Sequence, residues 1–349
     1  MAGLYSSGAS VKKIRITWFD DDARRVEKFR PVLEHGRPGA RVTLEFVPVK
    51  SSALIDLQTW LESAQDHPPD LVIIDHVFAY APALPFKLQG SSVAHLLRLA
   101  LASVPMVCVT AKFDKKPDLF DEEDLSEYTA LFPFQHLGQH LESLFAIARD
   151  FKKLQVDTEP LREHVIDCVK APKWDRERVL QILPEEFRGG KVHTTSHRVA
   201  RWIWNAFLYR PGFLYDRLAA ATLLGLNEDG FRKVEDLFTK ALYKGVFSTT
   251  SEPRWWVSTL LREIYRIAPE SAESSQHLGR KLPGIHTDDF SVCFSTKLAT
   301  PPPDSVVYVD ASPSAKRVAV SRKFSERHPS DQSVAIGFDT KLVLMTMPK

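Results

Sequence analysis

Cysteine is scarce in this sequence, and that scarcity excludes a disulfide-stabilised fold. The 349 residues include only three cysteines, Cys108, Cys168 and Cys293, and no two of them form a Cys-x-x-Cys pair. Such a pattern is typical of a reducing compartment. No stretch approaches the ~18 apolar residues of a membrane span, and the first residues lack the apolar run of a signal peptide. We therefore expect a cytoplasmic protein that makes no membrane contact.

Familiar catalytic motifs are also missing. The sequence contains no GxGxxG or GxxxxGK[ST] phosphate loop, no GxSxG nucleophile turn and no HExxH zinc motif. The hypothesis of an enzymatic function stays open only because the C-terminal region has polar residues that could form a catalytic site. Their spacing specifies no reaction. These residues are Asp304, Asp310, Lys316 and Arg317. A non-enzymatic protein is the expectation.

What is present is the composition of a globular protein with a hidden charge asymmetry. Hydrophobic residues make up 44% of the chain and charged residues 26%, and the net charge is +2. Residues 1–150 carry 16 basic against 20 acidic residues, a net −4, whereas the remainder carries 30 against 24, a net +6. A mildly basic second half permits an anionic partner such as DNA, but is far from the strongly basic profile of most nucleic-acid domains.

The hydrophobic pattern divides the chain into four segments. Residues 1–11 form a flexible N-terminus, and residues 12–152 alternate short apolar runs with amphipathic helices, which indicates a doubly wound five-stranded parallel sheet. Residues 153–268 predict a helical domain, and residues 269–349 a small β-rich region. The strands predicted for the sheet are Ile14–Phe19, Val42–Val47, Leu71–Ile74, Met106–Thr110 and Tyr128–Phe132.

Acidic residues follow two of these strands, at the edge of the sheet where α/β folds build their functional sites. Asp20, Asp21 and Asp22 follow the first strand, Asp75 follows the third, and the hydroxyl of Thr110 ends the fourth. Carboxyl ends of parallel strands share one edge of the sheet. Carboxylates gathered there repel one another, and a hard cation such as Mg²⁺ would relieve that repulsion. One of the three consecutive acids should instead cap the helix that follows.

The FDDD run, DLVIID, VCVTA and LFPF together resemble the receiver domain of two-component response regulators, over residues 12–150. The resemblance implies that Asp20, Asp21 and Asp75 bind Mg²⁺ and that Asp75 accepts a phosphoryl group. Thr110 would then follow the phosphoryl oxygens. It also implies a histidine kinase as phosphoryl donor and a homodimer formed through the fourth and fifth strands.

Two departures make this an atypical or degenerate receiver. The family places a lysine before the proline of the fifth strand, and here Phe132 stands before Pro133. A phenyl ring cannot neutralise phosphoryl charge, which is a major part of such catalysis. Lys112 is the nearest substitute. The loop from His76 to Gly90 is also longer than the family pattern, and its apolar content indicates a cover over the acidic site.

The helical domain is rich in aromatic residues, and two functions remain open for it. Trp, Tyr and Arg are favoured anchors at protein interfaces, so the first prediction is a signalling adaptor whose receiver-like domain regulates binding of a protein partner. The alternative is a phosphorylatable response regulator with a winged-helix-like DNA-binding output at residues 196–267, in which Phe231–Lys244 is a helix. Its phosphate contacts would be Arg232, Lys233, Lys240, Lys244 and Arg254.

Overall fold

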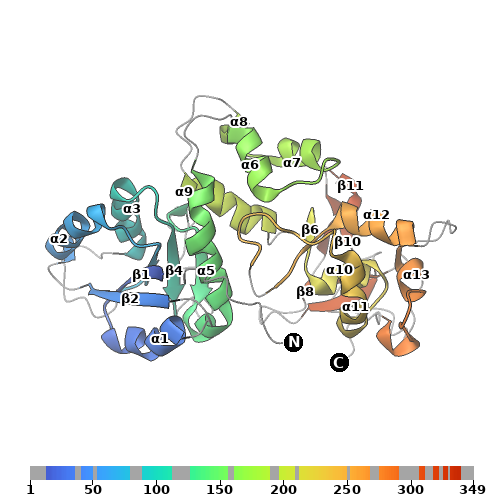
Figure 1. Cartoon of the computed structure of the whole chain (residues 1–349), viewed down its shortest axis with the longest axis horizontal. Helices are drawn as coiled ribbons and strands as arrows, with labels where there is room; N and C mark the ends of the chain where they lie inside the picture. The colour runs from blue at the N-terminus through green and yellow to red at the C-terminus, as the bar shows by residue number, and fades with distance from the viewer. Residues whose placement is uncertain are drawn as a thin grey trace, which may run out of the picture. The chain divides into compact units, whose positions relative to one another are not determined.

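The fold is described from a computed structural model of the chain (Figure 1). The residues described are 13–35, 41–49, 53–78, 89–111, 126–155, 161–188, 196–208, 212–249, 252–267, 275–290, 306–310, 317–321, 325–328 and 331–338. For residues 53–56, 276–277 and those after 290, only the course of the backbone is described. Residues 112–125, which include Lys112, lie outside these ranges. So do residues 79–88, which make up most of the predicted cover over the acidic site.

The chain forms two compact units, and each is described by itself. Unit 1 comprises Met1–Val169, Leu183–Asn205 and Thr249–Ser251, and unit 2 comprises Lys170–Ile182, Ala206–Ser248 and Glu252–Lys349. The predicted domain boundaries at residues 152 and 268 stay predictions. Among the described helices, none is both long enough and apolar enough to cross a membrane.

Unit 1 is built on a five-stranded sheet in which every pairing is parallel. Its strands are β1 (Lys13–Asp20), β2 (Arg41–Pro48), β3 (Leu71–Ile74), β4 (Met106–Thr110) and β5 (Ala130–Pro133). They lie in the order β2-β1-β3-β4-β5, so the chain winds outward in one direction and then in the other from β1. The short, nearly continuous apolar runs of β3 and β4 are wholly buried, as strands covered on both faces must be. The predicted fold class is confirmed.

Helices cover both faces of this sheet. They are α1 (Ala23–His35), α2 (Ala53–Asp66), α3 (Gly90–Ala100) and α5 (Leu141–Asp150), the last flanked by 3₁₀ turns at Phe134–His140 and Phe151–Leu154. From α2 and α3, Trp60 and Leu97 pack in one core with Ile74 of β3. On the opposite face, Phe29 of α1 lies 6.4 Å from the ring of Trp18 in β1. Because successive side chains of a strand point to opposite faces of the sheet, the strands contribute side chains to two separate hydrophobic cores.

Three more helices complete unit 1, and a turn that it shares with unit 2 follows them. They are α6 (Leu161–Val169), α8 (Glu185–Arg188) and α9 (Ser196–Arg201), and α9 leads into a π-helical turn at Trp202–Leu208. His197 of α9 is only 4% exposed, and its ring lies 4.9 Å from that of Phe151.

Unit 2 contains a helical core and, among its described residues, three separate two-stranded sheets. The helices are α7 (Arg176–Ile182), α10 (Arg217–Leu223), α11 (Glu228–Val234), α12 (Val257–Ile267) and α13 (Ser275–Arg280), with 3₁₀ turns at Glu235–Phe238 and Thr287–Asp289. The strands are β6 (Leu214–Tyr215), β7 (Trp255–Trp256), β8 (Val306–Asp310), β9 (Arg317–Ser321), β10 (Ser325–His328) and β11 (Asp331–Phe338). β6 pairs with β7, β8 with β9, and β10 with β11, all antiparallel.

The predicted helix Phe231–Lys244 is wrong beyond Phe238. The chain leaves the helix because residues 241–243 pair with β7 instead: the Trp256 amide donates to the Ala241 carbonyl at 2.8 Å, and the Tyr243 amide donates to the Arg254 carbonyl at 2.8 Å. Lys240 and Lys244 therefore stand after the helix. Helix propensity in this stretch loses to pairing with a buried strand.

Candidate functional site

Three carboxylates meet at the carboxyl edge of the unit 1 sheet. Asp20 ends β1, Asp21 follows it, and Asp75 comes directly after β3. Because β1 and β3 are parallel neighbours with Phe19 opposite Ile74, the residues after these two positions emerge side by side. One oxygen from each of the three carboxylates lies within 4.8 Å of the others. The structure thus brings together the three acids that the sequence predicted as a cluster.

Burial makes this cluster electrostatically costly. Asp20 is 1% exposed and Asp75 is 2% exposed. Burial raises the pKa of Asp20 to about 7, against an amide hydrogen bond from Asp22, and the charge of Asp75 raises it further. Burial likewise raises the pKa of Asp75, while the neighbouring guanidinium of Arg25 lowers it. Buried like charges at this spacing require a cation or a proton.

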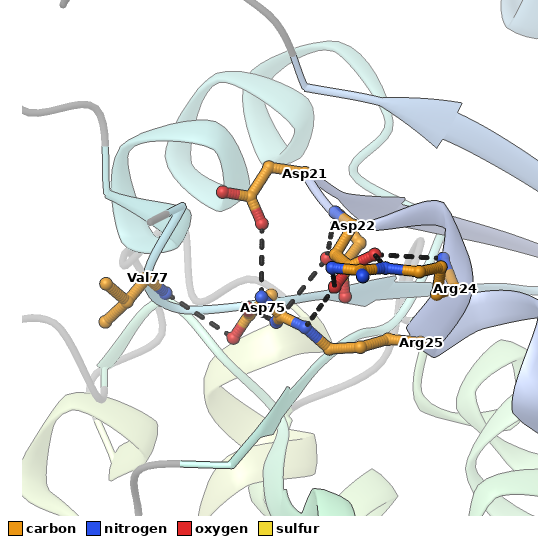
Figure 2. Close-up of polar contacts among 7 residues, drawn as sticks. Asp21, Asp22, Arg24, Arg25, Asp75 and Val77 are labelled. Atoms are coloured by element: carbon orange, nitrogen blue, oxygen red, sulfur yellow. Dashed lines mark hydrogen bonds and ion pairs between the residues drawn. The ribbon is translucent and has the colours of Figure 1, made fainter. Parts of the chain in front are cut away.

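A positively charged side chain of the protein lies at the cluster (Figure 2). Arg25, in the first turn of α1, directs its guanidinium into the group of acids. Its Nη1 donates to Asp75 Oδ2 and lies 3.5 Å from Asp20 Oδ1, and its Nη2 donates to Asp21 Oδ1 at 3.3 Å. The Arg25 side chain is only 20% exposed. These opposing charges raise the pKa of Arg25, against the effect of its burial.

Arg25 was not singled out by the sequence analysis, although a signal for it was present. It stands four residues after Asp21 and three after Asp22, spacings that place side chains on one face of a helix. The fourth acid, Asp22, has the capping role that was predicted for one member of the run. Its Oδ1 accepts the Arg24 amide at 3.0 Å, and hydrogen bonds from Arg24 lower its pKa. Asp22 thereby fixes the first turn of α1, on which Arg25 stands.

The residues expected to complete a receiver site are both buried at the same edge. Thr110 ends β4, is 2% exposed and lies opposite Pro133 of β5. Phe132, at the position of the family lysine, is 3% exposed. Its ring lies 5.2 Å from that of His140 and 5.9 Å from that of Trp204. An aromatic cluster within unit 1 therefore holds Phe132 where a receiver presents an ammonium group.

Behind Asp75 the backbone is closely packed. The Gly90 amide donates to the carbonyl of His76 at 2.8 Å, and a Cβ at position 90 would lie 2.1 Å from the Asp75 carbonyl oxygen. His76 is itself buried, 3.4 Å from the hydroxyl of Tyr128. The glycine at the start of α3 is thus required by the close approach of the segment that carries Asp75.

The five basic residues proposed for DNA contact are differently placed in unit 2. Arg232 and Lys233 are exposed on α11, but Arg232 pairs with Asp229 at 3.2 Å and Lys233 with Asp289 at 2.7 Å. Arg254 has a side chain only 9% exposed. The remaining two, Lys240 and Lys244, are exposed beyond the end of the helix.

The cluster has the donor set of a magnesium site but a different occupant. Carboxylate oxygens are ligands that Mg²⁺ accepts, usually one or two of them together with water. The position that bridges Asp20 Oδ1 and Asp75 Oδ2 is taken by Nη1 of Arg25. The acidic cluster is therefore of the kind expected for a receiver, whereas the ion itself stays a prediction.

These features define unit 1 as an α/β domain of receiver/flavodoxin-like topology with an acidic cluster at the carboxyl edge of its sheet. Among solved structures, the chain is similar to a CheY-like receiver domain from Methylobacillus flagellatus, with 15% identity, 35% of this chain and 86% of that chain covered, and a TM-score of 0.26. It is also similar to RcsB from Salmonella enterica serovar Typhimurium, solved bound to a promoter, with 11% identity, 54% and 97% covered, and a TM-score of 0.25.

No family model and no curated protein matches the chain. The TM-scores of both similar structures lie far below those of a shared whole-chain fold. The assignment of unit 1 therefore rests on its strand order and on the position of its acids, not on these likenesses.

Proposed function

We propose that this chain is a signalling adaptor of the response-regulator type, whose receiver-like unit 1 regulates binding of a protein partner by unit 2. The observation that carries the proposal is the acidic cluster at the edge of the sheet together with Phe132 at the lysine position. The site has kept the geometry of a receiver, and has lost the group that stabilises a phosphoryl transfer.

The packing of Phe132 supports a site that works without phosphorylation. A lysine at position 132 would have to replace the ring that packs against His140 and Trp204. Burying a charge among these rings without a partner would cost several kcal/mol, so this packing favours an apolar side chain over the usual lysine. Regulation through unit 1 would then depend on docking at this domain and not on charge added to Asp75.

Unit 2 has the element order of a winged helix, which hosts protein and nucleic-acid partners alike. β6 is followed by α10 and α11, residue 242 then bridges to Trp255, and β7 returns to pair with β6. Residues 243–248, which follow this bridge, would take the place of the wing, and we call them the wing-like turn. Asp216 and Asn227 cap α10 and α11 by accepting the amides of Ala219 and Gly230 at 2.9 and 2.7 Å, which fixes the turn between the two helices.

Charge favours a protein partner over DNA. α11 and the 3₁₀ turn after it carry four acidic and two basic residues. Both basic residues are already ion-paired, Arg232 with Asp229 and Lys233 with Asp289. Phosphates would have to displace those pairs and approach four carboxylates, whereas nucleic-acid affinity rests on basic groups available to phosphate.

DNA binding is the second candidate, favoured by one specific observation. Lys240 and Lys244 are exposed on either side of the chain's entry into the wing-like turn. Contacts with DNA phosphates from that turn would not require α11 to touch the DNA. This candidate belongs to the phosphorylatable response regulator, so it also requires that Asp75 accept a phosphoryl group.

The first experiment is intact mass spectrometry of the full chain after incubation with Mg²⁺ and acetyl phosphate. The adaptor proposal expects no covalent adduct in the wild type. A gain of about 80 Da, the mass of one phosphoryl group, that is absent from Asp75→Asn would contradict it and restore the phosphorylatable regulator.

The second experiment separates the two partners of unit 2. Fluorescence anisotropy with duplex DNA at low salt should show no binding that depends on the wing-like turn. The matched variant is Lys240→Ala with Lys244→Ala. Binding by the wild type that weakens steeply with salt and disappears in this variant would assign the unit to DNA.

A further inference from the structure

The guanidinium of Arg25 sits where the oxygens of three buried carboxylates converge (Figure 2). Nη1 bridges Asp75 and Asp20, and Nη2 reaches Asp21. The planar guanidinium offers five N–H donors in a fixed fork, so one side chain can satisfy several carboxylate oxygens at once. No other basic side chain within the described residues makes an ion pair with Asp20 or Asp75.

We infer that Arg25 takes the place of the divalent cation in this site, so that unit 1 keeps its acidic edge together without Mg²⁺. The inference deepens the proposed function and rests on the receiver-like site described there. It makes the receiver-like unit independent of the ion on which phosphoryl chemistry in this type of site depends.

Geometry excludes simultaneous occupancy by both cations. Mg²⁺ binds carboxylate oxygens at about 2.0–2.1 Å in octahedral geometry. An ion bridging Asp20 Oδ1 and Asp75 Oδ2 would fall on the position of Nη1, which contacts both oxygens. Two positive charges at that separation also repel strongly in a buried site. For the ion to enter, Arg25 must leave.

The local structure holds Arg25 in place. α1 begins directly after the acids, and Asp22 both caps its first turn and lies 3.8 Å from Nε of Arg25. The side chain is four-fifths buried, so leaving would expose a long stem and remove the Arg25 ion pairs of Asp20, Asp21 and Asp75. Arg24 next to it is the natural control, because its side chain is 83% exposed and pairs with Asp22, outside the group of three carboxylates.

The test compares thermal unfolding of the full chain with and without millimolar Mg²⁺ for the wild type, Asp75→Asn, Arg25→Met, Arg24→Met and Arg25→Met with Asp75→Asn. Methionine keeps an unbranched stem and removes the charge. We expect no shift in the wild type or in Arg24→Met. Arg25→Met alone should be stabilised by Mg²⁺, by several degrees, because a ligand that binds only the folded state raises its unfolding temperature.

Two results overturn the inference. One is a Mg²⁺ shift in the wild type that Asp75→Asn removes, and the other is no Mg²⁺ shift in Arg25→Met. Should Arg25→Met fail to fold, the wild type decides: its Arg25 side-chain nitrogen resonances must stay unchanged through a Mg²⁺ titration, and movement overturns the inference.

Failure of this inference can be distinguished from failure of the proposed function. Mg²⁺ binding by the wild type would remove the role of Arg25 and leave the adaptor standing. An adduct on Asp75 would instead remove the phosphorylation-independent adaptor.

Discussion

His197 should make the stability of this protein depend on pH in a defined direction. The imidazole lies in α9, almost fully buried against Phe151. Burial, helped by the positive charge of Arg98, lowers the pKa of His197 from 6.5 to about 4. A neutral ring is therefore kept in the folded state at a pH where the unfolded chain would already bind a proton.

The sign and the magnitude follow from proton linkage. Between pH 6.5 and 4 the unfolded state binds more protons than the folded state, so the free energy of unfolding falls as the pH falls. At about 1.4 kcal/mol per pH unit, the loss is about 1.4 kcal/mol by pH 5.5 and about 3 kcal/mol by pH 4. Well above pH 6.5 the imidazole is neutral in both the folded and the unfolded state, so His197 no longer makes the free energy of unfolding depend on pH.

The assay is urea unfolding of the wild type and of His197→Leu at a series of pH values. Subtracting the two curves removes the titration of groups common to both proteins. The difference should be flat above pH 7 and should change by about 3 kcal/mol down to pH 4. His35→Gln, at an exposed position at the end of α1, controls for the loss of a histidine as such. A flat difference for His197→Leu would refute a buried neutral imidazole.

Three further substitutions test the packing of unit 1 and a helix cap of unit 2. Gly90→Ala should lower the free energy of unfolding by about 3 kcal/mol in urea unfolding, because its Cβ would meet the Asp75 carbonyl at 2.1 Å; Gly138→Ala, with a neighbour only at 4.0 Å, should have little effect. Phe132→Ala should cost about 3–5 kcal/mol by the same measurement, and a loss under about 1 kcal/mol would contradict its burial. Asp216→Ala should cost about 1 kcal/mol, with helical circular dichroism reporting the weakened start of α10.

The sequence was sufficient for the sheet of unit 1 and for the location of its site. Short apolar runs bounded by polar residues are local signals, and the predicted Leu71–Ile74 and Met106–Thr110 coincide with β3 and β4. In a parallel sheet the residues after β1 and β3 emerge at one edge, so the sequence pattern places Asp20 and Asp75 there. Their close approach also requires that β1 and β3 be neighbours, which is a matter of strand order.

Unit 2 was harder to predict, because its short elements are decided by contacts between distant residues. The stretch after Phe231 has the composition of a long helix, yet it ends at Phe238 since residues 241–243 pair with the strand at Trp255 and Trp256. Two-residue strands such as β6 carry almost no local signal, and their pairing depends on which backbone groups are left near one another.

By itself, the sequence determined which acids gather in unit 1 and that Phe132 stands where a lysine is expected. Only the tertiary structure decided what balances the charge of those acids. The guanidinium of Arg25 reaches Asp75, fifty positions away, because β3 is inserted beside β1 and brings the two segments to the same edge. Local patterns fix the elements of a fold, whereas the partner of a buried charge is set by which side chains the packing encloses with it.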